Sequence, residues 1–128
     1  MTAARAMRAT PQWPSRQTIA SRQHDSLGPP RIPPDIRLWD LHTGQCLRVF
    51  RGHSKVVGRL SWSRDQRLIL SPSFDRTVRL WSVESGECLR VLEGHRAGVK
   101  RVVYTADESG AVSCDWSGEI RRWNLSGR

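Results

Sequence analysis

The amino-acid sequence predicts an all-β protein built from antiparallel four-stranded units, and three observations carry this prediction. The chain from residue 35 onward repeats itself with a constant offset of 42 positions. Short runs rich in β-forming residues alternate with turn signals, which is typical of antiparallel strands. No window sustains the 3.6-residue period of a helix. We therefore expect strands and turns throughout the repeated region.

The repeat is recognised from residue types that recur in register without any gap. The tryptophans Trp39, Trp81 and Trp123 share one position of the repeat, and His53 and His95 share another. The run GQCLRVF (44–50) likewise aligns with GECLRVL (86–92). Self-similarity at this period indicates a repeat architecture in which each unit is one small group of strands.

Four strands are predicted within the best-defined unit, in chain order. VVGRLSW (56–62) is the first, and RLILS (67–71) follows a polar turn at Asp65 and Gln66. TVRLWS (77–82) is rich in β-forming residues, and ECLRVL (87–92) alternates after a turn at Ser85 and Gly86. Strands of five or six residues between such turns make an antiparallel sheet.

The segment 1–34 is unlike the rest of the chain. It holds five arginines and a single acidic residue, Asp25, and it ends in two Pro-Pro pairs. No helix or strand period holds, so we predict a disordered or irregular segment that is rich in Arg, Pro and Ser. An acid-poor, Arg-rich start is also typical of an organelle transit segment, here at 1–30.

Composition restricts the class of protein further. No run of about 18 apolar residues is present, and the first 30 residues lack the apolar block of a secretory signal, so no membrane contact is expected. The three cysteines are odd in number and form no CxxC, which argues against a disulfide framework or a zinc ribbon. Free thiols favour a reducing compartment, and we expect a cytoplasmic protein.

The sequences GHSKVVGRLSWSRDQRLILSPSFDRTVRLWS (52–82) and GHRAGVKRVVYTADESGAVSCDWSGEIRRWN (94–124) each carry an early Gly-His and a late Trp. With DIRLWD (35–40) before them, they resemble the WD-repeat β-propeller family over residues 35–128. The resemblance implies an incomplete set of blades: partial at 35–50, complete at 56–92 and partial at 98–124. That amounts to about two and a quarter blades, whereas closed propellers have about 4–8.

In that family, a His, a Ser or Thr, an Asp and a Trp form a buried hydrogen-bonded tetrad within a blade. The positions that match here are His53, Ser71, Asp75 and Trp81 in one unit, and His95, Ser113 and Trp123 in the next. The acid position of the second unit holds Ser117, so the resemblance implies a weaker second network.

A catalytic role for these residues is the alternative, because His53, Ser71 and Asp75 are the residue types of a hydrolase triad. The sequence lacks a GxSxG nucleophile elbow, and the same residues match the structural pattern. The spacing of Cys46, Cys88 and the histidines does not fit a zinc site. We predict no enzyme activity, no catalytic residue, no cofactor and no metal.

The predicted function is that of a non-enzymatic scaffold that binds other proteins. Phe74 and Trp116 are the candidate contact residues, because the family places this position on its binding face and exposed aromatics are good anchors. The missing blades indicate a fragment of a longer propeller protein, self-association through open blade edges, or partial folding.

Two alternatives remain. The net charge of +9 also fits a basic module that binds anions or nucleic acid, although a preference for Arg in the composition explains it as well. The basic residues are scattered and do not interleave with stacking aromatics, so nucleic acid is the less favoured partner. The second alternative is that the chain is a non-catalytic piece of a larger multidomain enzyme.

Overall fold

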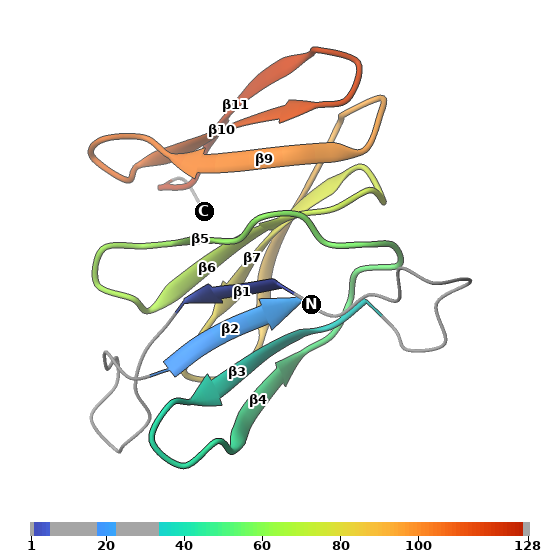
Figure 1. Cartoon of the computed structure of the whole chain (residues 1–128). Helices are drawn as coiled ribbons and strands as arrows, with labels where there is room; N and C mark the ends of the chain where they lie inside the picture. The colour runs from blue at the N-terminus through green and yellow to red at the C-terminus, as the bar shows by residue number, and fades with distance from the viewer. Residues whose placement is uncertain (1, 6–17, 23–33, 127–128) are drawn as a thin grey trace.

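The structure is a computed structural model, and it describes residues 2–5, 18–22 and 34–126. All regular structure in these residues is β, arranged in three antiparallel sheets that follow one another in chain order (Figure 1). No helix in the described part is long and apolar enough to cross a membrane. The strands are β1 Thr2–Arg5, β2 Thr18–Arg22, β3 Ile36–Asp40, β4 Cys46–Phe50, β5 Ser61–Trp62, β6 Leu68–Pro72, β7 Thr77–Ser82, β8 Cys88–Glu93, β9 Val99–Tyr104, β10 Gly110–Asp115 and β11 Ile120–Asn124.

The first sheet has four strands in the order β1-β2-β3-β4. The predicted strand pair within 35–50 is present as β3 and β4, but β2 adds to the free edge of β3 and β1 adds to β2. Within the segment 1–34, for which the sequence predicted a disordered or irregular chain, the structure places residues 2–5 and 18–22 in strands. The remainder of that segment, 6–17 and 23–33, lies outside the described residues.

The middle sheet, β5-β6-β7-β8, contains the unit predicted at 56–92. Its β5 is only two residues long, whereas the sequence indicated a strand over 56–62. Continuing the register of Ser61 with Leu70 places Arg59 opposite Pro72. Proline has no N–H to donate to a sheet ladder, so the pairing is interrupted there. Pairing resumes only at an isolated bridge between Val57 and Ser73.

The third sheet has three strands in the order β11-β10-β9, as expected for 98–124. Its first strand, β9, extends over six residues, with one register shift opposite Cys114 and Asp115. Cys114 stands here in the position that Pro72 takes one repeat earlier, and it pairs with Arg101. The replacement of a Cys114-like residue by Pro72 therefore explains why β5 is shorter than β9.

Two hydrophobic clusters join the sheets. The first packs Ile36, Leu38 and Phe50 of the first sheet against Ile69 and Trp81 of the middle one. The second cluster lies on the opposite face of the middle sheet, where its members are Leu70, Val78, Leu80, Leu92, Val99, Val102 and Ala111. Both faces of the middle sheet are thus buried, as Figure 1 shows from its position between its neighbours. Each buried aliphatic side chain contributes about 1.5–3 kcal/mol, so these contacts hold the stack together.

The third sheet leaves one face open within the part of the chain that the structure describes. Leu38 and Leu80 are 0% and 5% exposed because each faces the next sheet, but Arg122, in the same position of the repeat, is exposed. Ile120 and Val103 on that face are 70% and 45% exposed. A shallow hollow of about 460 Å³ lies at the end of this sheet, lined by Arg122, Trp123 and small polar residues.

Candidate functional site

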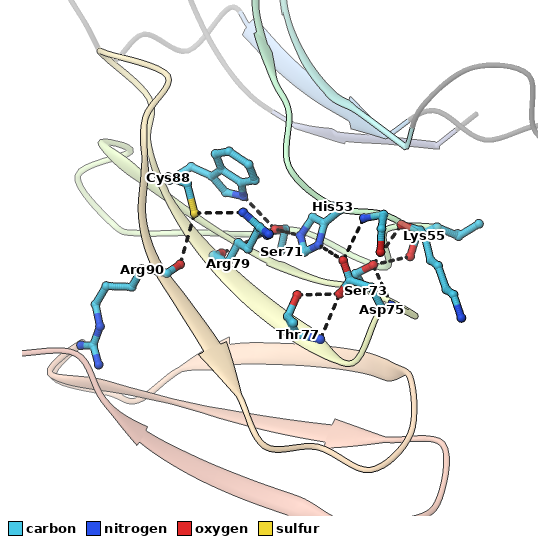
Figure 2. Close-up of polar contacts among 12 residues, drawn as sticks. His53, Lys55, Ser71, Ser73, Asp75, Thr77, Arg79, Cys88 and Arg90 are labelled. Carbon is cyan, nitrogen blue, oxygen red and sulfur yellow. Dashed lines mark hydrogen bonds and ion pairs between the residues drawn. The ribbon is translucent and has the colours of Figure 1, made fainter.

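A chain of hydrogen bonds crosses the middle sheet and contains the four predicted tetrad residues (Figure 2). His53 Nδ1 donates to Asp75 Oδ2 over 2.9 Å. His53 Nε2 lies 2.6 Å from Ser71 Oγ, and Trp81 Nε1 donates to the same oxygen over 2.8 Å. Because a carboxylate only accepts, His53 Nδ1 carries a proton, and Nε2 forms its hydrogen bond with the Ser71 hydroxyl. The two ring nitrogens of His53, the hydroxyl of Ser71 and the indole N–H of Trp81 therefore all have hydrogen-bond partners.

Asp75 also organises the turn that follows β6. Its Oδ1 accepts hydrogen bonds from the N–H and the hydroxyl of Thr77, and its Oδ2 accepts one from Ser54 N–H. Burial raises the pKa of Asp75, but the hydrogen bonds from His53, Thr77 and Ser54 outweigh burial and hold it well below its usual range. The carboxylate is a permanent acceptor that ties the loop at 53–54 to the turn at 73–77.

The glycine of the first Gly-His pair has a separate role. Gly52 has φ of +158°, and a Cβ at this position would lie 2.6 Å from Arg79 Nη1 and 3.2 Å from Trp81. A side chain here would be disfavoured by this φ, and it would displace the Arg79 guanidinium and press on the Trp81 ring. The Gly-His pair thus combines a close backbone approach with a buried hydrogen-bonding group.

The third sheet contains an equivalent network with the same spacing. His95 Nε2 lies 2.6 Å from Ser113 Oγ, and Trp123 Nε1 donates to that oxygen over 2.8 Å. His95 Nδ1 donates to Asp115 Oδ2 over 2.9 Å. The expectation that this network lacks an acid was wrong, because it assigned the acid position to Ser117.

The serine and the aspartate have exchanged places between the two turns. The middle sheet has Ser73 and Asp75, while the third sheet has Asp115 and Ser117. Ser117 donates from both its N–H and its hydroxyl to Asp115 Oδ1. The hydroxyl bond from Ser117, together with the bond from His95, holds the pKa of Asp115 below its usual range despite burial. A search for acids anywhere within the turn, rather than at one aligned position, would have found Asp115.

These networks do not offer a reactive nucleophile. Ser71 is fully buried and His53 is 6% exposed, so a substrate cannot reach the Ser71 hydroxyl. A metal-like grouping occurs at His95, Asp115 and Glu119, whose nearest ligand atoms lie within 4.8 Å of one another. In it, however, His95 and Asp115 are hydrogen-bonded to each other, and Glu119 forms an ion pair with Arg121. The geometry fits a structural role that fixes the loops.

The two predicted contact residues, Phe74 and Trp116, lie side by side on the surface. Their ring centroids are 6.0 Å apart with an interplanar angle of 50°. Phe74 is 44% exposed and Trp116 is 60% exposed. The sequence did not indicate that Lys100 joins them, yet its Nζ lies 4.8 Å from the centroid of the Trp116 ring. We call Phe74, Trp116 and Lys100 the aromatic patch.

The two aromatic residues of the patch are held in place by the turns that contain Asp75 and Asp115. Phe74 directly precedes Asp75, and its N–H donates to Val56 O over 2.9 Å. Trp116 directly follows Asp115, and its N–H donates to Gly98 O over 2.9 Å. Gly98 lets the loop pass close to Phe74, since a Cβ there would lie 3.0 Å from Phe74 Cα. Two turns from neighbouring sheets thereby present their aromatic rings together on a rigid base.

Consecutive antiparallel sheets, a buried His-Ser-Asp-Trp network in each of two of them, and an exposed patch on the connecting turns define a repeat scaffold of the protein-interaction type. The family model described as "WD domain, G-beta repeat" matches residues 44–82 and 86–124, so the chain belongs to the WD-repeat family. This confirms the resemblance stated from the sequence. Members of this family generally bind other proteins and generally lack enzyme activity.

One similar protein is Pre-mRNA-processing factor 17 of Saccharomyces cerevisiae. The two sequences are 44% identical over 43 residues, which is 33% of this chain and 10% of the yeast protein. The match thus spans about one repeat, and the chain covers only a small part of its relative.

Proposed function

We propose that the chain is a non-enzymatic scaffold that binds another protein through the aromatic patch. The observation that carries this proposal is the pairing of Phe74 with Trp116, two large exposed rings held 6.0 Å apart by adjoining turns. Aromatic side chains expose much contact area with few rotatable bonds, so they dominate the free energy of many interfaces. The buried networks beneath them keep the turns in place, which lowers the entropy cost of binding.

The test compares partner capture by variants that remove the rings. The affinity-tagged chain, the Phe74→Ala/Trp116→Ala variant and a Leu89→Ala variant are each incubated with cell extract, and bound proteins are quantified by mass spectrometry. Leu89 is a matched control, because it is an apolar side chain, 47% exposed, on β8 away from the patch. Thermal unfolding of each variant verifies that it is folded.

The expected result is a set of proteins captured by the chain and by the Leu89 variant but lost from the double variant. Equal capture by all three would exclude the aromatic patch as the contact site.

A further inference from the structure

The end of the sheets that bears the aromatic patch carries exposed positive charge. The loops and turns there span 51–56, 73–77, 94–100 and 115–119. Their exposed cations, apart from Arg51, which pairs with Asp35, are Lys55, Arg76, Arg96 and Lys100. Figure 2 shows the Lys55 side chain directed away from the buried network. These exposed charges lie at the same end of the sheets as the aromatic patch.

The carboxylates at the same end are mostly committed to other groups. Asp75, which is partly buried, and Asp115, which is buried, are acceptors in the two networks. Glu119 pairs with Arg121 at 3.3 Å. Glu93, the last residue of β8, is the remaining exposed acid near these loops in the described part of the chain. The positive charges are consequently left without local neutralisation.

The opposite end of the sheets has the reverse balance. Its turns span 40–45, 63–67, 83–87 and 105–109. They carry two arginines, Arg64 and Arg67, and the acids Asp40, Asp65, Glu84, Glu87, Asp107 and Glu108. Charge is thus segregated along the strand direction in the part of the chain that the structure describes. Such a field attracts an acidic partner to the aromatic end in particular.

Lys100 links this charge to the rings. Its Nζ rests over the face of Trp116, a contact that orients the ammonium group, while the side chain is exposed. The ammonium group of Lys100 has three N–H donors. The contact with the Trp116 ring does not use any of them in a conventional hydrogen bond. A carboxylate approaching from solvent would meet an oriented cation beside an apolar surface.

We propose that the aromatic patch recognises an acidic peptide segment that carries an apolar side chain. The apolar side chain packs on Phe74 and Trp116, and flanking Glu or Asp side chains pair with Lys100 and with Lys55, Arg76 or Arg96. This inference rests on the proposed function and adds the chemistry of the partner. A peptide fits better than single-stranded nucleic acid, because the two rings meet at 50° and one face of Trp116 is covered by Lys100. Successive bases need open, free ring faces to stack on.

The experiment uses three probes with the full chain: a peptide of Glu residues around one central Leu, the same peptide with Gln for every Glu, and an oligouridylate. Binding is measured by calorimetry at low and at moderate ionic strength. We expect the Glu peptide to bind about tenfold more tightly than the Gln peptide, with a difference that shrinks as salt screens the charges.

Three variants locate the contact. Lys100→Gln and Trp116→Ala should each weaken binding of the Glu peptide several-fold, whereas Arg67→Gln, an exposed arginine at the opposite end, should not. Arg76→Gln gives a second measure of the charge effect if either patch variant unfolds.

Equal affinity for the Glu and Gln peptides would overturn the preference for acid while leaving the proposed protein-binding site intact. Tighter binding of the oligouridylate than of the Glu peptide would overturn it in favour of nucleic acid. Binding of neither peptide would also overturn it. An effect of Arg67→Gln equal to that of Lys100→Gln would show that the attraction is not located at the patch.

Discussion

His95 Nδ1 lies 2.9 Å from Asp115 Oδ2, the same distance that separates His53 from Asp75, although Asp115 stands two positions earlier in its repeat. The imidazole is held in place by a carboxylate in both sheets, and the turn supplies that carboxylate from either side of its exposed aromatic residue. A satisfied buried polar network rigidifies its surroundings. The geometry of the network is therefore retained while the sequence of the turn differs.

The exchange of serine and aspartate predicts a rescue. Asp115→Ser removes the acceptor for His95 Nδ1 and should lower the melting temperature. The double variant Asp115→Ser/Ser117→Asp reproduces the order found at Ser73 and Asp75 and should recover most of the loss. Differential scanning calorimetry measures both. A double variant no more stable than Asp115→Ser would mean that the two turns are not interchangeable.

The indole hydrogen bond of Trp81 is predicted to contribute to stability. Trp81→Phe removes the donor to Ser71 Oγ and should cost about 1 kcal/mol more than the same change at Trp62. Trp62 is a matched control, because it packs on the same hydrophobic cluster, while its buried Nε1 has no hydrogen-bond partner in the described residues. Urea unfolding followed by circular dichroism gives both values. Equal losses of unfolding free energy in the two variants would contradict a stabilising contribution from this hydrogen bond.

The raised pKa of Tyr104 predicts that the fold loses stability at alkaline pH. Burial, followed by the nearby charges of Glu108 and Asp65, raises the pKa of the Tyr104 hydroxyl far above 10.0. A group with a raised pKa in the folded state stabilises the fold below its unfolded pKa and loses that contribution as pH rises further. The free energy of unfolding should therefore fall above about pH 10.

The Tyr104→Phe variant isolates this effect. Its hydroxyl has no hydrogen-bond partner among the described residues, so the variant should be at least as stable as the parent chain at neutral pH. Between about pH 10 and 11 it should lose less stability than the parent. Identical pH profiles for the two proteins would contradict the assignment.

The lowered pKa of Asp75 predicts that the fold loses stability as the pH falls into the acid range. Its pKa is held below the usual 3.8, so the unfolded chain takes up a proton first as pH falls. The contribution of Asp75 to stability is then complete above about pH 5 and is lost progressively below about pH 4. Asp75→Asn should flatten the fall in urea midpoint between these values, and Glu84→Gln, an exposed acid of the turn 83–87, should not. Parallel profiles for Asp75→Asn and the parent chain would contradict this origin of acid sensitivity.

Much of the fold could be predicted because the repeat carries redundant information. The run of β-forming residues predicted the strand Thr77–Ser82, and the resemblance to the WD-repeat family implied that His53, Ser71, Asp75 and Trp81 form one network. Asp115 was missed because a strict register allows one residue for each role. Hydrogen-bond geometry accepts any carboxylate in the turn that reaches His95.

Other features depend on contacts that a local pattern does not contain. The residues of β2 show no strand period of their own and become a strand by pairing with the edge of β3. Lys100 meets Trp116 only because the start of β9 lies beside the turn that follows β10. Shortening of β5 was the reverse case, since Pro72 was visible in the sequence and its effect on Arg59 follows from the register.

The middle sheet is buried on both faces, while the third sheet has an open one. Backbone amides exchange with solvent deuterium only when their hydrogen bonds open, and a sheet that is covered on both faces opens only after a neighbour has moved away. The amides of β6 and β7 should therefore exchange most slowly, and those of β11 much faster. The chain would lose its order from the outside inward, one repeat at a time, as a linear array does.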